Sequence, residues 1–189
     1  MTENAPQSIV DALRSDHESI RALLHDTAAT EDTPDGLAAR EQLVMALMRH
    51  FVAEEQYLDP TIRAELAGGG RIADDSFAAD RESENALRLL EDEDIGMDRI
   101  HAVWQELIES FGAHVARQEP VLTELAETCD AAQLAELGEG VLGAEQLAPT
   151  RPRTVATSSA AANKVISFVE GYLDHVRDYY TKRGVTDRD

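Results

Sequence analysis

The sequence contains little cysteine, glycine, proline or aromatic side chain. Cys129 is its one cysteine, which excludes an intrachain disulfide and leaves no CxxC pair for zinc or redox chemistry. We therefore interpret Cys129 as a small buried residue. Gly occupies 11 positions and Pro 6, while hydrophobic residues make up 43%. This composition is typical of a chain that folds rather than of a disordered tail.

Positive charge and long apolar runs are also scarce. Lys and Arg number 17 against 37 Asp and Glu, which gives a formal net charge of −20. Such a surface repels phosphate backbones and anionic lipid, so nucleic acid and membrane partners are disfavoured. No run approaches the roughly 18 apolar residues of a membrane helix, and the start "MTENAPQSIVDALRSD" has no basic n-region or apolar h-region. We expect a cytoplasmic protein.

Helical periodicity dominates the first two thirds of the chain. The length of 189 residues suits one well-packed domain with appendages. Strand-like alternation is almost missing, whereas four long segments repeat apolar residues at helical spacing. They run from about Gln7 to Ala28, from a cap at Thr33 to about Leu66, from about Asp74 to Glu91 and from about Met97 to Thr128. The predicted fold class is all-α, with an up-down four-helix bundle over residues 1–128.

Residues 129–189 form a predicted C-terminal extension packed on the same domain. "DAAQLAELGEGV" is typical of a short capped helix, and "APTRPRTVATSS" of an extended linker with proline. A last helix is predicted from Ala160 to Arg183. We expect a monomer or a weak homodimer.

Each of the four long helices carries side chains that could bind metal on its apolar face. Ionised carboxylates in a helix core cost several kcal/mol each unless a cation or hydrogen bonds compensate, and no stripe of lysine or arginine offers that charge. Imidazole with carboxylate suits Fe, Mn or Zn, and bundle cores with several of both hold two-metal sites. The candidate ligands are His17, His50, Glu54, Asp80, Glu84, His114 and Glu119.

Each position also has a simpler interpretation. A lone histidine on an apolar stripe is commonly a hydrogen-bonded core residue, and Asp80 with Glu84 could be the solvated acidic start of a helix. His114 and Glu119 are five residues apart, roughly 140° around a regular helix, so a shared metal needs a π-type bulge or a bend at Pro120. Gln118, at i+4, is the competitor in regular geometry. The remaining histidines, which lie off these faces, are His25, His101 and His175.

The order H, HxxxE, acidic pair, HxxxxE resembles the hemerythrin-like HHE cation-binding family. The segments "SDHESIRALL", "RHFVAEEQYLDP" and "FGAHVARQEPVL" carry the resemblance, and the C-terminal third resembles the extension of actinobacterial members. The resemblance implies a non-haem di-iron centre with oxo or hydroxo bridges. It implies terminal histidine ligands and bridging carboxylates at His17, His50, Glu54, His114 and Glu119.

The third helix departs from the family pattern. Hemerythrins have two histidines where this chain has Asp80 and Glu84, and related bacterial members have His then Glu. The candidate set therefore has three histidines and four carboxylates, against five and two in oxygen-carrying hemerythrins. Anionic oxygen ligands stabilise ferric iron, so oxidation or peroxide turnover is favoured over reversible oxygen transport.

Three functions follow from these residues. The leading hypothesis is a di-iron protein that reacts with or senses peroxide, dioxygen or nitric oxide, with a possible catalase-like activity. The second is a metal-binding or regulatory bundle without turnover, with Mn or Zn as the alternative metals. The third is a degenerate bundle without metal. Tyr57, one turn past Glu54, is expected either beside the site or in core packing.

Overall fold

A computed structural model describes residues 7–30, 36–91, 95–152, 174 and 178 of the chain. All regular elements within these ranges are helices, which confirms the all-α class. Most of the predicted helix from Ala160 to Arg183, His175 and the predicted cap at Thr33 lie outside the described residues. None of the described helices is long and apolar enough to cross a membrane.

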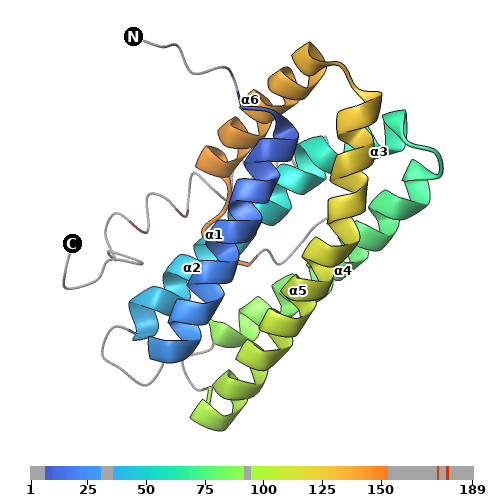
Figure 1. Cartoon of the computed structure of the whole chain (residues 1–189). Coiled ribbons are helices and arrows are strands. Elements are labelled where there is room, and N and C mark those ends of the chain that lie inside the picture. The colour runs from blue at the N-terminus through green and yellow to red at the C-terminus, as the bar shows by residue number, and fades with distance from the viewer. Residues whose placement is uncertain (1–6, 31–35, 92–94, 153–173, 175–177, 179–189) are drawn as a thin grey trace.

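Seven helical elements follow one another along the described chain (Figure 1). The predicted second helix is continuous but changes its winding in the middle, so it comprises three elements. Cys129, directly after the longest helix, is buried as predicted. The elements are α1 (Ile9–Thr30), α2 (Gly36–Ala53), the π-helix η1 (Glu54–Leu58), α3 (Asp59–Glu65), α4 (Gly69–Leu90), α5 (Met97–Thr128) and α6 (Ala131–Leu147).

The turn between α3 and α4 is shorter than the sequence indicated. Leu66 ends α3 in an extended conformation, and Gly68 has a φ of 73°, a left-handed conformation that glycine adopts without steric cost. The chain therefore reverses within three residues, and α4 begins at Gly69. The predicted start at Asp74 is wrong, because the glycines belong to the turn and the first helical residues rather than to a longer loop.

A π-helical segment interrupts the second long helix at Glu54. The N–H of Asp59 donates to the carbonyl of Glu54, which closes a turn one residue wider than in an α-helix. Pro60 follows directly and has no N–H to donate, so the regular ladder cannot pass through it. The wider turn places Glu54, Leu58 and Asp59 together in the interior.

The interior consists of two hydrophobic clusters that meet along each long helix. Residues near the start of α1 belong to the second cluster, and residues near its end belong to the first. Helix α2 contributes to the first cluster, and α3, which continues it, contributes to the second. Helices α4 and α5 repeat this alternation. Large members of the first cluster are Leu24, Leu47, Phe51, Leu87, Trp104 and Leu107. Members of the second include Ile9, Leu13, Leu58, Ile62, Leu122 and Val141.

A layer of buried polar side chains lies where the two clusters meet. Each long helix contributes to it, and all of its members are shielded from solvent. We call this set the polar layer. It contains His17, His50, Glu54, Asp80, Glu84, His114 and Gln118.

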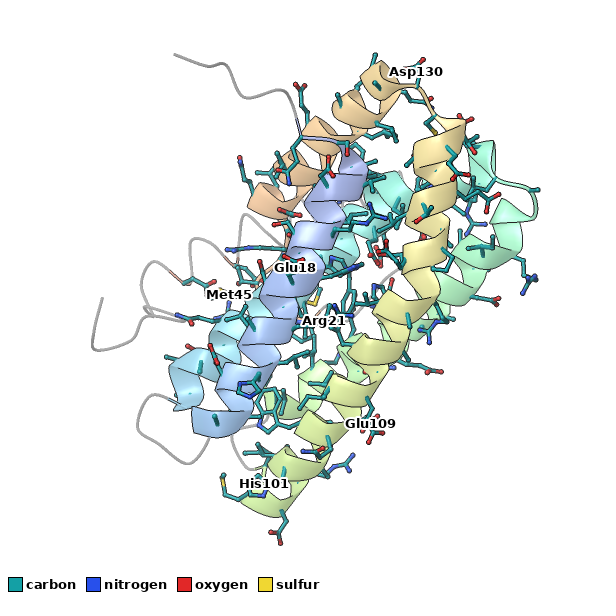
Figure 2. All side chains as sticks on the ribbon, in the orientation of Figure 1. Glu18, Arg21, Met45, His101, Glu109 and Asp130 are labelled. Carbon is teal, nitrogen blue, oxygen red and sulfur yellow. The ribbon has the colours of Figure 1, made fainter. Side chains whose placement is uncertain are left out.

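The long helices pack pairwise around the polar layer, and α6 covers one side. Helix α1 contacts α2 and α5, while α4 contacts α5 and α3. Helix α6 packs on α1, α2 and η1 (Figure 1). The ring of Tyr57 lies against Gly140 of α6, so Tyr57 packs between η1 and α6. Figure 2 shows His101 at the opposite end of α5 from Asp130.

Close packing of α6 predicts a position-dependent effect of adding a methyl group. A Cβ on Gly138 would lie 2.0 Å from the carbonyl oxygen of Gln7, whereas no described atom lies within 4 Å of a Cβ on Gly143. Gly138→Ala should therefore lower the free energy of unfolding by about 1–3 kcal/mol. Gly143→Ala, the control in the same helix, should raise it by up to about 1 kcal/mol. Urea unfolding measures both, and equal stability of the two variants would contradict the docking of α6 on α1.

Candidate metal centre

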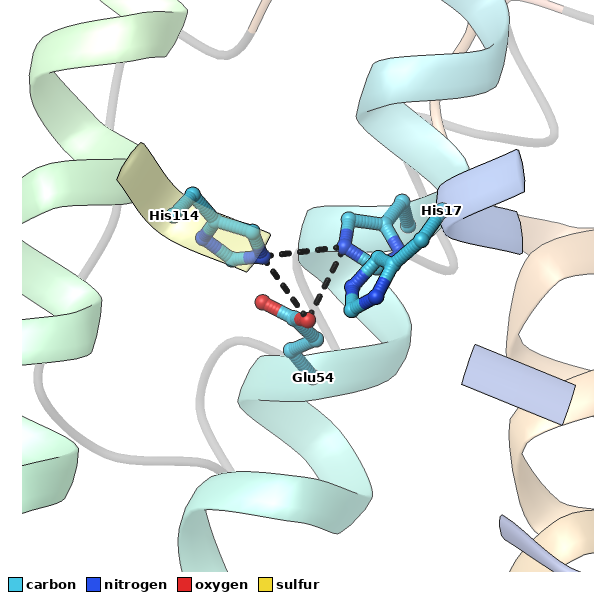
Figure 3. Close-up of side chains that lie close together, drawn as sticks. His17, Glu54 and His114 are labelled. Atoms are coloured by element: carbon cyan, nitrogen blue, oxygen red, sulfur yellow. Dashed lines mark hydrogen bonds and ion pairs between the residues drawn. The ribbon is translucent and has the colours of Figure 1, made fainter. Parts of the chain in front are cut away.

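Four buried side chains from separate parts of the sequence converge in the polar layer. His17 comes from α1, His50 from α2, Glu54 from η1 and His114 from α5. One nitrogen or oxygen atom of each lies within 4.8 Å of those of the others. Figure 3 shows His17, Glu54 and His114 pointing toward one another. We call these four residues the buried His/Glu group, and such a group could hold a metal ion.

One carboxylate oxygen occupies the middle of the group. Oε1 of Glu54 lies 2.9 Å from Nε2 of His50 and 3.3 Å from Nε2 of His114, and the two Nε2 atoms lie 3.2 Å apart. The amide of Gln118 donates to the same oxygen at 2.6 Å. Three nitrogens therefore surround Oε1 of Glu54. The two imidazole nitrogens among them require protons or a cation beside this oxygen.

The imidazole of His17 has no hydrogen-bond partner on either ring nitrogen, although the residue is only 2% exposed. Its ring lies edge-on to the rings of His50 and His114, with centroids 5.0 and 5.6 Å away. Buried polar atoms are nearly always paired, and an unpaired one costs about 1–3 kcal/mol. An imidazole that faces two other imidazoles and a carboxylate without bonding any of them is placed as a metal ligand would be.

Carboxylates lie behind two of the histidines. Oδ1 of Asp80 lies 3.2 Å from Nδ1 of His114 and holds that nitrogen. Oδ2 of Asp16 lies 3.5 Å from Nδ1 of His50, and this contact is not a hydrogen bond. In both residues the Nε2 atom is left facing the group. Metal-binding histidines are commonly oriented by a carboxylate on the opposite nitrogen. The structure thus places Asp80, a predicted ligand, behind His114 rather than within the group.

The other two predicted ligands on α4 and α5 are not brought into the group. Glu84 is buried and bonds Arg81, so the solvated interpretation of Asp80 and Glu84 is wrong for both. Glu119 bonds Arg14, and its side chain is 47% exposed. Helix α5 stays α-helical through Pro120, so Glu119 points roughly 140° away from His114. The bulge or bend that would bring Glu119 inward is not formed.

Gln118 fills the position beside His114 that regular helical spacing assigned to it as the competitor of Glu119. Three other residues near the site, Asp16, Asp59 and Glu145, were not predicted. Asp16 is next to His17, but its contact is with His50. Asp59 is buried through the widened turn of η1. Glu145 lies within bonding reach of Asp16 but belongs to α6, and no spacing pattern links those two positions.

Burial and the charges of neighbouring residues give the three histidines of the group different pKa values. Burial and the neighbouring His50 lower the pKa of His17 to about 4. Burial opposes the charged form of His50 and His114 too, but Glu54 outweighs it, with Asp16 and Asp80 adding to the effect. The pKa of His50 is raised to about 9 and that of His114 to about 10. Without metal, two imidazolium rings therefore supply the positive charge beside Glu54.

The carboxylates show the complementary effect. Burial favours the neutral acid in Glu54, but His50 and His114 outweigh it and hold the pKa of Glu54 well below its usual range. Asp59 has no such partner. Burial and the nearby charges of Glu54 and Asp80 raise the pKa of Asp59 to about 8. Asp59 thus holds a proton at neutral pH, whereas Glu54 is an anion.

No protein-family model, curated protein or solved structure matched this chain in three comparisons.

The histidines of the metal-free protein should differ in charge at pH 7. His17 should be neutral, whereas His50 and His114 should be protonated and lose their protons only as the pH rises through about 9 and about 10. Because their pKa values are raised on folding, they stabilise the fold below the unfolded value of about 6.5, and this contribution is lost above pH 9. Imidazole ¹⁵N shifts report each charge directly. A charged His17 or a neutral His114 at pH 7 would contradict the assignment.

Proposed function

We propose that this chain is a hemerythrin-like non-haem iron protein whose buried centre reacts with or senses peroxide, dioxygen or nitric oxide. The observation that carries the proposal is the environment of His17. Both of its ring nitrogens are buried without a hydrogen-bond partner, although one of them lies within 4.8 Å of ligand atoms of His50, Glu54 and His114. A divalent cation would pair these atoms and replace the two protons that His50 and His114 carry. The donor set of imidazole and carboxylate suits Fe, Mn or Zn.

Unpartnered oxygens next to the group support a site for two irons. Oε1 of Glu54 faces the imidazoles, while its Oε2 is buried without a hydrogen-bond partner, so the carboxylate can bridge two cations. Oδ2 of Asp80 is also buried and unpartnered. Glu119 would join the site only by leaving Arg14. We therefore propose His17, His50, Glu54 and His114 as the principal ligands, with Asp80 beside them.

The surroundings favour redox chemistry at this position. Iron bound here would supply a cation that exchanges electrons with small oxygen or nitrogen species. The ring of Phe111 stacks on His114 with centroids 5.6 Å apart, and Phe51 packs beside His50. These rings exclude water and fix the imidazoles. Asp80 keeps Nε2 of His114 directed inward, and the negative charge of Asp16 and Asp80 favours the ferric state.

The arrangement of the helices supports the hemerythrin-like bundle as well. The four long helices pass alternately from one hydrophobic cluster to the other, as an up-and-down order requires. The polar layer crosses all four at the same level. Helix α6 then forms an addition to a four-helix core.

A zinc protein without turnover is the second candidate. Three histidines and one carboxylate are a complete set of four ligands, and closed four-ligand sites are typical of structural zinc. Such a site would leave no position for peroxide or oxygen. Metal identity and peroxide response therefore distinguish the two candidates.

Metal content and reactivity test the proposal together. Protein purified without a metal-affinity tag and loaded anaerobically with Fe²⁺ should bind about two irons by plasma mass spectrometry. Addition of hydrogen peroxide should consume peroxide and produce charge-transfer absorption in the near ultraviolet. One inert zinc would support the structural alternative, and no bound metal would exclude both.

His17→Ala is the most informative variant for this experiment. Removal of His17 takes away no hydrogen bond, since its ring nitrogens have none, so the metal-free fold should lose only packing. Metal affinity should fall by a factor of more than 100, by loss of a ligand. The control is His25→Ala, an exposed histidine beside Asp26, which should leave metal content unchanged. Undiminished binding by His17→Ala would exclude His17 as a ligand.

Asp80→Asn separates orientation of His114 from direct ligation. The asparagine amide carries no negative charge and accepts the hydrogen bond of Nδ1 of His114 more weakly than the carboxylate does. Metal affinity should therefore fall about 10- to 100-fold. The absorption spectrum of the filled site should keep its pattern, because the ligands of the buried His/Glu group are unchanged. Loss of one metal ion per chain in Asp80→Asn would instead identify Asp80 as a direct ligand. Asp74→Asn, an exposed change in the same helix, is the matched control.

A further inference from the structure

Two cavities lie along the contact between α4 and α5, and His114 lines both of them. The larger, of about 230 Å³, is bordered by Asp75, Asp80, Glu82, Glu106 and Arg117 in addition to His114. The smaller, of about 200 Å³, shares Asp75 and Arg117 with it and continues to Gln118. We call the two together the α4–α5 groove. It connects the outer surface with a member of the buried His/Glu group.

The inner wall of the groove presents an unsatisfied acceptor. Asp80 is 1% exposed, and its Oδ2 has no hydrogen-bond partner. Its other oxygen contacts Nδ1 of His114 at 3.2 Å. A buried carboxylate oxygen without a partner costs free energy, and a cation in the cavity would satisfy it. This feature is independent of the acidic residues at the rim.

The charge of the larger cavity favours cations. Four carboxylates line it, from Asp75, Asp80, Glu82 and Glu106, against two positive charges, the guanidinium of Arg117 and the imidazolium of His114. Asp75 shares its charge with Arg71 at 3.2 Å, but that pair is exposed and contributes little in water. Glu82 and Glu106 lie exposed at the rim, while Asp80 is buried. Negative charge thus continues from the surface to the inner wall.

We propose that the α4–α5 groove is the port through which a hydrated divalent cation reaches the buried His/Glu group. The proposal depends on the metal centre described above. Each water takes about 30 Å³ in the liquid, so the larger cavity has room for a cation with several of its waters. The ion exchanges waters for Oδ2 of Asp80 and is then passed inward past His114. Rows of like charge in a cleft raise the local concentration and association rate of the opposite charge.

A cation fits this groove better than the small molecules of the proposed reaction. Peroxide, dioxygen and nitric oxide are uncharged, so a lining of carboxylates does not attract them. An anion would be repelled at the rim. Arg117 and the imidazolium of His114 are the exceptions in the lining, and both should slow the passage of a cation.

Stopped-flow loading of the metal-free full chain with Co²⁺ tests the port. The visible absorption of cobalt reports its arrival among imidazole and carboxylate ligands. Asp75→Asn, Glu82→Gln and Glu106→Gln combined should slow the bimolecular loading rate at least fivefold at low ionic strength. This effect should shrink as salt is added, because screening weakens attraction between exposed charges. The amount of cobalt bound at saturation should stay equal to that of the wild type.

Matched variants separate the groove from overall charge. Glu124→Gln, Glu127→Gln and Glu139→Gln combined remove three exposed carboxylates elsewhere and should change the rate less than twofold. Arg117→Glu should raise the loading rate at least twofold, whereas Arg99→Glu, at an exposed position near the start of α5, should not.

The outcomes distinguish this proposal from the metal centre itself. If the wild type binds cobalt but both triple variants load at the same rate, or Arg117→Glu does not load faster, the port is overturned and the centre stands. If the wild type binds no cobalt, both proposals fall.

Discussion

The structure depends on burying a layer of ionisable side chains between two hydrophobic clusters. Removal of a charged group from water costs several kcal/mol unless partners replace the water. Glu54 meets this condition through His50, His114 and Gln118. His17 does not, since both of its ring nitrogens lack partners. The site thus contains a carboxylate whose burial is compensated by hydrogen bonds and an imidazole whose burial is not. A bound cation would pair with the imidazole nitrogen of His17.

Local structure is adapted to this layer. The π-helical turn before Pro60 buries both Glu54 and Leu58. The same turn therefore supplies a carboxylate to the polar layer and a hydrophobic side chain to the second cluster. Asp80 orients His114 from outside the group, and Asp16 lies beside the outer nitrogen of His50. Helix α6 covers η1 and brings Glu145 toward Asp16. Helix α6 therefore contributes to the environment of the site as well as to packing.

Helical spacing predicted the centre of the site well and its border poorly. His17, His50, Glu54 and His114 lie on the apolar faces that periodicity assigned to them, because burial enforces the helical repeat at each position. Glu119 does not reach the group, since α5 continues without a bulge and Arg14 offers it an ion pair. Asp16 and Glu145 lie off those faces, and their roles depend on the packing of α1 against α2 and α6. The start of α4 was misplaced because a left-handed Gly68 makes a tighter turn than a run of glycines indicates.

The most direct test of the metal centre is a crystal structure of the iron-loaded protein with anomalous diffraction at the iron edge. We expect an anomalous peak within coordination distance of Nε2 of His50, Nε2 of His114, a carboxylate oxygen of Glu54 and a ring nitrogen of His17. A second peak bridged by Glu54 would establish two irons. Iron found only on the acidic surface, with His17 still unpartnered inside, would contradict the central claim that the buried His/Glu group is a metal site.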